Sequence, residues 1–250
     1  MVTFSPASLY AEDKSETDNT RVLTEDELES KIGRFGEAEE IPEGFEFNPA
    51  EVKLWMTDHF SSVTEPVSMY YEFERSGSYD PGFVDSVYLK VKKINEDGTK
   101  NCQLDFLTGE KKQVVRPENV TEITGNPILG IFLQGDVQNM QQLTEGHYRH
   151  FIKMIKVALR EVATVEPVTF SFDGKDYSGE KIMFAPYLND THRTEYERFA
   201  VKTYEFIFAE KLPGQLYQIK TTIPDIADPE AKKPLIQETV TLKGIKAYKS

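Results

Sequence analysis

A single amphipathic helix, predicted over residues 144–163, constrains the fold more than any other feature of this chain. At 100° per residue its apolar side chains fall on one side: Phe151, Ile155, Ala158, Leu159 and Val162. Its cations fall in an opposite arc of about 60°: Arg149, Lys153, Lys156 and Arg160. Strand patterns precede and follow this helix. We therefore predict an α+β fold, in which a curved, half-barrel-like antiparallel sheet packs against one long helix and shorter helices.

Alternating side chains and hairpin turns predict roughly nine or ten strands. The expected strands cover residues 67–75, 84–94, 101–106, 111–116, 120–123, 168–172, 181–185, 201–209, 216–223 and 235–246. Shorter helices are predicted over residues 48–60, 128–133 and 136–143, with Asn48, Asn126 and Asp136 as start signals. All these elements fit a single α+β domain spanning residues 45–250.

The acidic charge of the chain is concentrated near the N-terminus. The formal net charge is −13, and residues 12–46 hold 13 acidic against 4 basic side chains. Such an acidic surface argues against nucleic-acid binding. The composition of residues 12–44 predicts a largely disordered segment. Within it, Leu28, Ile32 and Phe35 share one side of a short amphipathic helix, which either docks on the body or serves as a motif for a partner.

The first eleven residues change abruptly at Ala11 into the acidic segment, as the last part of an export signal does. This favours a periplasmic or secreted protein, although a cytosolic N-terminus has a similar composition. No stretch approaches the roughly 18 apolar residues of a membrane span, so no transmembrane segment is predicted. Cys102 is the only cysteine, and its place in a strand pattern predicts a buried, inert thiol.

Catalytic and cofactor-binding signatures are absent from the sequence, so no cofactor and no metal are predicted. His147 and His150 have a spacing that suits metal ligands, but no cysteine or carboxylate accompanies them on that side of the helix. We interpret them as a half-buried His147 and an exposed His150. The densest polar cluster contains Asp190, His192 and Tyr196, which as consecutive loop residues favour an exposed connection over an acid–base site.

The basic side of the long helix, formed by Arg149, Lys153, Lys156 and Arg160, has three interpretations. It is a solvated helix face, a contact for an anionic group or an acidic partner, or a surface for the acidic segment of this same chain. Solvation is the commonest reason for such a face. That these four cations contact an anionic group or a partner is therefore a hypothesis, which the structure has to test.

The order of elements resembles the half-barrel family of bacterial lipoprotein-localisation (Lol-type) carriers and related envelope proteins. The resemblance lies in an early helix over residues 48–60, a strand meander, the long helix and closing strands that include Gly214-Gln-Leu-Tyr-Gln-Ile-Lys220. It is architectural, and no functional residue is transferred from it. It implies a hydrophobic cleft between sheet and helices that holds lipid or acyl chains, although fold alone does not fix function.

Three functions follow as hypotheses. The first is a non-enzymatic, exported carrier that binds a lipid or amphipathic molecule in a cleft between sheet and helix. Its candidate cleft residues, each of which also suits an ordinary core, are Trp55, Tyr70, Phe151, Ile155, Leu159, Tyr204 and Tyr217. The second is an envelope assembly protein that binds a protein partner through the acidic segment. The third is a hydrolase-like enzyme, which requires Asp190 or His192 in a cleft beside a polar group from a distant segment.

Overall fold

The computed structural model describes residues 46–111, 119–228 and 230–248. Three predictions concern residues outside these ranges: the export signal, the acidic segment with Leu28, Ile32 and Phe35, and most of the strand expected over residues 111–116.

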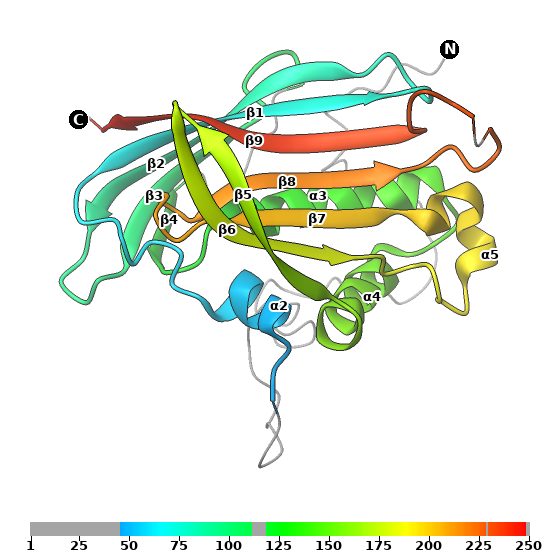
Figure 1. Ribbon diagram of the computed structural model, residues 1–250, viewed down its shortest axis with the longest axis horizontal. Helices are drawn as coiled ribbons and strands as arrows, with labels where there is room; N and C mark the ends of the chain where they lie inside the picture. The colour runs from blue at the N-terminus through cyan, green and yellow to red at the C-terminus, as the bar shows by residue number, and fades with distance from the viewer. Residues whose placement is uncertain (1–45, 112–118, 229, 249–250) are drawn as a thin grey trace, which may run out of the picture.

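Within the described ranges, nine strands form one antiparallel sheet in the order β4-β3-β2-β1-β9-β8-β7-β6-β5 (Figure 1). Their bounds are β1 Val67–Gly77, β2 Phe83–Ile94, β3 Lys100–Phe106, β4 Asn119–Ile123, β5 Thr164–Phe172, β6 Lys175–Phe184, β7 Thr203–Phe208, β8 Leu216–Ile223 and β9 Ile236–Ala247. Two meanders meet where β1 pairs with β9. The predicted α+β class is confirmed, and the sheet is not strongly curled.

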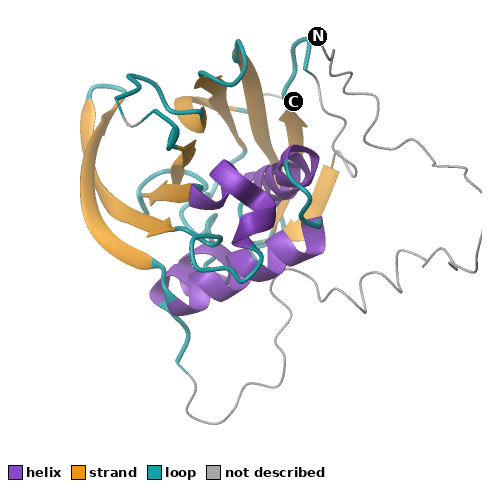
Figure 2. Cartoon of the chain, turned by 90° about the vertical axis from the view of Figure 1, so that its right-hand side faces the viewer, coloured by secondary structure: helices purple, strands orange, loops and turns teal. Residues whose placement is uncertain are grey.

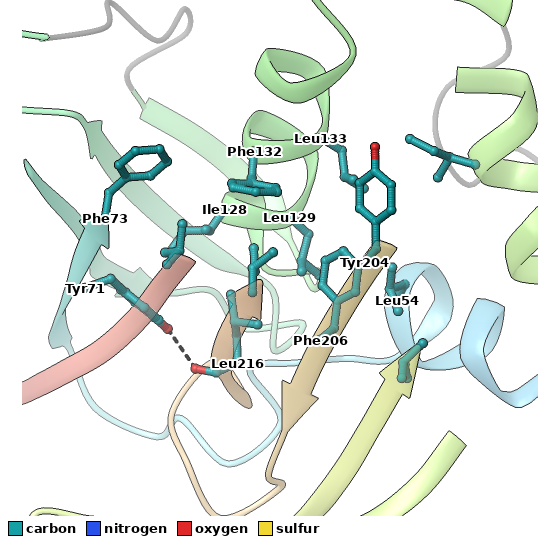
Figure 3. Packing of buried hydrophobic residues seen from close by; sticks show 14 of the residues in the cluster. Leu54, Tyr71, Phe73, Ile128, Leu129, Phe132, Leu133, Tyr204, Phe206 and Leu216 are labelled. Carbon is teal, nitrogen blue, oxygen red and sulfur yellow. Dashed lines mark hydrogen bonds between the residues drawn. The ribbon is translucent and has the colours of Figure 1, made fainter. Parts of the chain in front are cut away.

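The core lies on one side of the sheet, because buried and half-buried residues alternate along its strands. On β1, Met69, Tyr71 and Phe73 are buried while their neighbours are not. The Tyr71 hydroxyl donates to the Leu216 carbonyl over 3.2 Å, which satisfies this buried phenol (Figure 3). Full burial of each such apolar side chain contributes about 1.5–3 kcal/mol.

Helix α3, Pro127–Leu143, covers the core face of the sheet. Asn126 caps it as expected, since its side chain accepts from the Ile128 amide over 3.1 Å. The expected break into two short helices is wrong. Asp136 is not a cap but a buried residue within the helix, because its carboxylate accepts hydrogen bonds from Lys202 and Tyr204 instead of from the backbone.

Helix α4, Tyr148–Glu161, is the predicted amphipathic helix, although α3 is longer. Its buried side chains are those expected, except that Val162 is 56% exposed because it lies at the C-cap, beyond the last turn. The histidine assignment is reversed. His147 is exposed and caps the helix through Nδ1, whereas His150 is half-buried.

Helix α2, Pro49–Glu51, begins at the predicted cap Asn48 and continues as a π-helical turn, η2, over Val52–Met56. It ends before Phe60, earlier than predicted, because the amide and hydroxyl of Thr57 both donate to the Val52 carbonyl over 3.0 Å. The Asn48 side chain also donates to the Ala163 carbonyl, so α2 lies against the end of α4. Figure 2 shows the helices grouped together, with strands around them.

The β5–β6 hairpin turns away from the sheet and crosses in front of β7 and β8 (Figure 1). Gly179 permits this course, because a Cβ atom there would lie only 2.1 Å from the Phe208 carbonyl oxygen. Phe170 on the hairpin stacks on Tyr217 of β8 with ring centroids 3.8 Å apart. The outer face of the sheet is thus partly covered by its own edge strands. Two short helical segments, α5 Arg193–Tyr196 and η3 Glu197–Val201, connect β6 to β7.

Candidate functional site

A hollow of about 260 Å³ opens where β6 ends and β7 begins. Its walls are Met183, Phe184, Thr203, Tyr204 and Glu205. Phe184 and Tyr204 are paired across the two strands, and their rings stack with centroids 5.1 Å apart. Both rings also belong to the core, so the hollow adjoins the apolar layer between sheet and helices.

One wall residue of this hollow, Tyr204, belongs to a fully buried polar network. The Tyr204 hydroxyl donates to the Asp136 carboxylate on α3, and the Tyr187 hydroxyl lies 3.0 Å from that of Tyr204. Lys202 forms an ion pair with the same carboxylate, and both charged side chains are 1% exposed. Buried charges are tolerated when they are paired and hydrogen-bonded, as they are here. The network fixes α3 against the start of β7.

Both phenols of the network remain protonated. Burial, reinforced by the negative charge of Asp136, raises the pKa of Tyr204 and of Tyr187 well above the ordinary value of 10.0. They therefore act only as hydrogen-bonding groups at physiological pH. An apolar wall with a few fixed polar groups behind it is the usual composition of a small-molecule site.

The candidate cleft residues occupy two different environments. Phe151, Ile155, Leu159 and Tyr204 are buried in the same core cluster, and Trp55 packs against its margin. Tyr217 also packs against this cluster, whereas Tyr70 lies outside it. Tyr70 packs beside Tyr88, with ring centroids 5.2 Å apart, and Tyr217 stacks under the hairpin. The structure therefore brings six of the seven residues to one cluster and its margin, and leaves out Tyr70.

The basic residues of α4 remain on the surface. Arg149, Lys153 and Arg160 are exposed and Lys156 is half-buried. Nη2 of Arg160 lies 3.4 Å from Oε1 of Glu51, which links α4 to α2.

Asp190 is buried, and it joins the β6–β7 connection to α4. Its Oδ2 lies 2.7 Å from His150 Nε2 and accepts from the Tyr196 hydroxyl over 3.1 Å. Its Oδ1 accepts from the His192 amide over 3.0 Å. Burial opposes ionisation, but these three donors together lower the pKa of Asp190 below 3.8.

His192 contributes its backbone amide to this cluster, while its side chain is exposed and interacts with Glu195. Its Nδ1 lies 2.8 Å from Glu195 Oε1, and this contact raises the pKa of His192 above 6.5. A second hollow, of about 270 Å³, has Glu195 and Tyr196 in its wall. Because both Asp190 oxygens already accept hydrogen bonds from this chain, the geometry supports a positioning role for the carboxylate.

The Asp136 network was missed in the sequence. One feature of the sequence could have revealed this network. Asp136 lies three residues after Leu133 and four before Met140, so it falls on the apolar side of α3. A carboxylate in such a place requires buried partners. Lys202 and Tyr204, however, are separated from it by 66 and 68 residues, and no local pattern indicates them.

Among the described residues, no group of three His, Cys, Asp or Glu side chains is arranged to hold a metal ion. Cys102 is buried, and burial raises the pKa of its thiol to about 12. Across residues 46–111, 119–228 and 230–248, no helix combines the length and apolarity needed to cross a membrane.

No known family model and no curated protein sequence matches this chain. Among solved structures it is similar to the lipoprotein LppX of Mycobacterium tuberculosis, with 8% identity and a TM-score of 0.30 over 73% of this chain and 88% of that one. It is also similar to a LolA superfamily protein of Nitrosomonas europaea, with 8% identity and a TM-score of 0.21 over 80% and 94% of the two chains. The predicted architectural resemblance is confirmed. At these TM-scores the resemblance says nothing about function. An argument about function must come from the residues of this chain.

Proposed function

We propose that this protein is a non-enzymatic binding or carrier protein that holds a lipid or other amphipathic molecule between its sheet and helices. The observation that carries the proposal is the open hollow beside Phe184 and Tyr204, two rings that also belong to the apolar layer. Aromatic walls contact an acyl chain, and the hollow's polar rim at Thr203 and Glu205 faces the solvated end of the ligand.

The size of the hollow sets a further condition. Its volume of about 260 Å³ is below the roughly 300–1,000 Å³ of typical small-molecule sites. A complete acyl chain therefore enters only if α3 and α4 move away from the sheet. The buried Asp136–Lys202 pair restricts that movement on α3, and the His150–Asp190 contact restricts it on α4. Export to the periplasm or outside the cell is part of the same proposal and rests on the composition of residues 1–11.

The test is native mass spectrometry of the protein from its own host, followed by denaturing extraction of bound molecules. We expect a co-purified lipid or acyl species. In parallel, the delipidated protein is titrated with a fluorescent palmitate analogue. Met183→Trp places a large ring in the hollow and should weaken binding at least about tenfold, a change of about 1.4 kcal/mol.

Val84→Trp is the matched control, because Val84 is 64% exposed on β2, away from the hollow. It should bind the analogue as the unchanged protein does. A bare polypeptide that also fails to bind the analogue would contradict the carrier proposal. Equal binding by both tryptophan variants would exclude this hollow as the entry point.

A further inference from the structure

The exposed side of α4 is the most basic helical surface in the described part of an acidic protein. Four cations and one carboxylate, Glu161, lie on this helix, in a chain whose net charge is −13. We call the four cations, Arg149, Lys153, Lys156 and Arg160, the α4 surface. This surface already has interactions, since Arg160 contacts Glu51, Arg149 Nε donates to the Tyr148 hydroxyl, and Lys156 also has a partner.

Exposed apolar side chains lie on the element next to the α4 surface. Val52 and Met56, four residues apart on η2, are 38% and 47% exposed, and Val162 at the end of α4 is 56% exposed. The contact from Asn48 to Ala163 holds α2 beside the end of α4 (Figure 1). A basic strip thus has apolar side chains near one end.

The chain itself contains a segment with the complementary pattern. Residues 24–35 carry four carboxylates against two cations, Lys31 and Arg34, together with the spaced apolar residues Leu28, Ile32 and Phe35. The ten residues between this segment and Glu46 can span up to about 35 Å, whereas α4 is about 21 Å long. The segment therefore reaches every part of the α4 surface from the start of α2.

We propose that residues 24–35 dock on the α4 surface of the same molecule, with their carboxylates against its cations and Leu28, Ile32 and Phe35 against Val52, Met56 and Val162. The attachment to α2 gives the segment a high effective concentration at this surface, so that weak ion pairs suffice. The docked segment competes with any external anionic group for the same cations. This inference is independent of the carrier proposal, because the hollow lies between β6 and β7 and not on this surface.

The test is resonance energy transfer within the full chain. Trp55 on η2 is the only tryptophan and serves as donor. Ser30→Cys provides a site for a dansyl acceptor, because the native Cys102 is buried and its raised thiol pKa makes it unreactive. Docking predicts strong transfer at low salt. It also predicts at least a twofold loss at about 1 M salt, where the Debye length is about 3 Å.

Charge reversal locates the contact. Arg149→Glu with Lys153→Glu should lower the transfer as high salt does, whereas Lys232→Glu with Lys233→Glu should leave it unchanged. Lys232 and Lys233 are matched controls, because they are exposed cations on the connection between β8 and β9. Leu28→Ser with Ile32→Ser tests the apolar half and should also reduce transfer. Circular dichroism melting curves show that each variant is folded.

Two results would overturn the proposal. The first is transfer that is the same in both charge-reversed variants and at both salt concentrations. The second is transfer between molecules, detected when a labelled Trp55→Phe chain is mixed with an unlabelled chain that retains Trp55. Neither result changes the lipid content measured by mass spectrometry, so failure here is distinguishable from failure of the carrier proposal.

Discussion

Asp136 of α3 and Lys202, which directly precedes β7, form an ion pair whose side chains are each only 1% exposed. The carboxylate also accepts from Tyr204, which itself contacts Tyr187. The buried Asp136 carboxylate is therefore neutralised by one cation and hydrogen-bonded by one phenol. This arrangement makes the helix-to-sheet packing sensitive to any change in a single partner.

Lys202→Met should destabilise the fold by about 3–5 kcal/mol, because it leaves a buried carboxylate without its cation. The double variant with Asp136→Asn should recover part of this loss, since the remaining side chain is neutral. The free energy of unfolding in urea is the measurement. Lys243→Met is the control, because the Lys243–Glu72 pair is exposed and should contribute less than about 1 kcal/mol. Equal losses in the two single variants would contradict a special role for the buried pair.

Asp190→Asn should loosen the β6–β7 connection from α4, because the amide cannot accept from His150, Tyr196 and the His192 backbone as a carboxylate does. The expected loss of stability is about 1–3 kcal/mol. Hydrogen exchange should show faster exchange in residues 186–200 and at the start of α4. A variant with unchanged exchange there would show that the carboxylate does not hold the connection.

The Asp190 carboxylate should make a contribution to the free energy of unfolding that is lost in acid. The pKa of Asp190 in the folded protein is below its ordinary value of 3.8, so the unfolded chain binds its proton at the higher pH. The contribution is fully present above pH 3.8 and is lost as the pH falls through the lower folded-state value. Unfolding curves of the unchanged protein and Asp190→Asn should therefore converge below pH 3.8. A constant difference down to the acid limit would contradict this prediction.

The buried ring of His59 predicts that the protein loses stability as the pH falls below 6.5. Its Nδ1 accepts from the Asn126 amide over 3.0 Å and its Nε2 lies 2.7 Å from the Lys53 carbonyl, so the ring is bound in its neutral form. Burial lowers the pKa of His59 below 6.5. The contribution is complete above pH 6.5 and falls as acid drives protonation, by up to about 1.4 kcal/mol per pH unit. The free energy of unfolding of His59→Gln should lack this pH dependence. If it changes with pH between 5 and 7 with the same slope as that of the unchanged protein, the role given to His59 is contradicted.

Two glycines should respond to alanine in opposite directions. Gly179→Ala places a methyl group against the Phe208 carbonyl and should cost about 1–3 kcal/mol. Gly130 lies within α3, where an added Cβ has no atom within 4 Å, and Gly130→Ala should stabilise the protein by about 0.5–1 kcal/mol. Thermal and urea unfolding measure both. Destabilisation by Gly130→Ala would contradict this prediction.

Local patterns determined much of this fold. The 3.6-residue period of α4, the caps Asn48 and Asn126, and the alternation along β1 depend on neighbours a few residues away, so they are readable in the sequence. The buried side chains Phe151, Ile155 and Leu159 were predicted from that period and are confirmed as core. Prediction was poorest at Asp136, where a start signal for a helix was in fact an internal buried charge.

The way in which these elements are joined depends on contacts between distant parts of the chain. The pairing of β1 with β9, the course of the β5–β6 hairpin over β7 and β8, and the partners of Asp136 and Asp190 all connect residues that are distant in the chain. An acidic side chain has the same local preferences whether it faces water or a lysine, and the cost of burying its charge is offset only by a partner that folding brings to it. Local patterns therefore predicted most of the elements and their apolar faces. The long-range contacts determined the strand order, the buried networks and the position of the hollow.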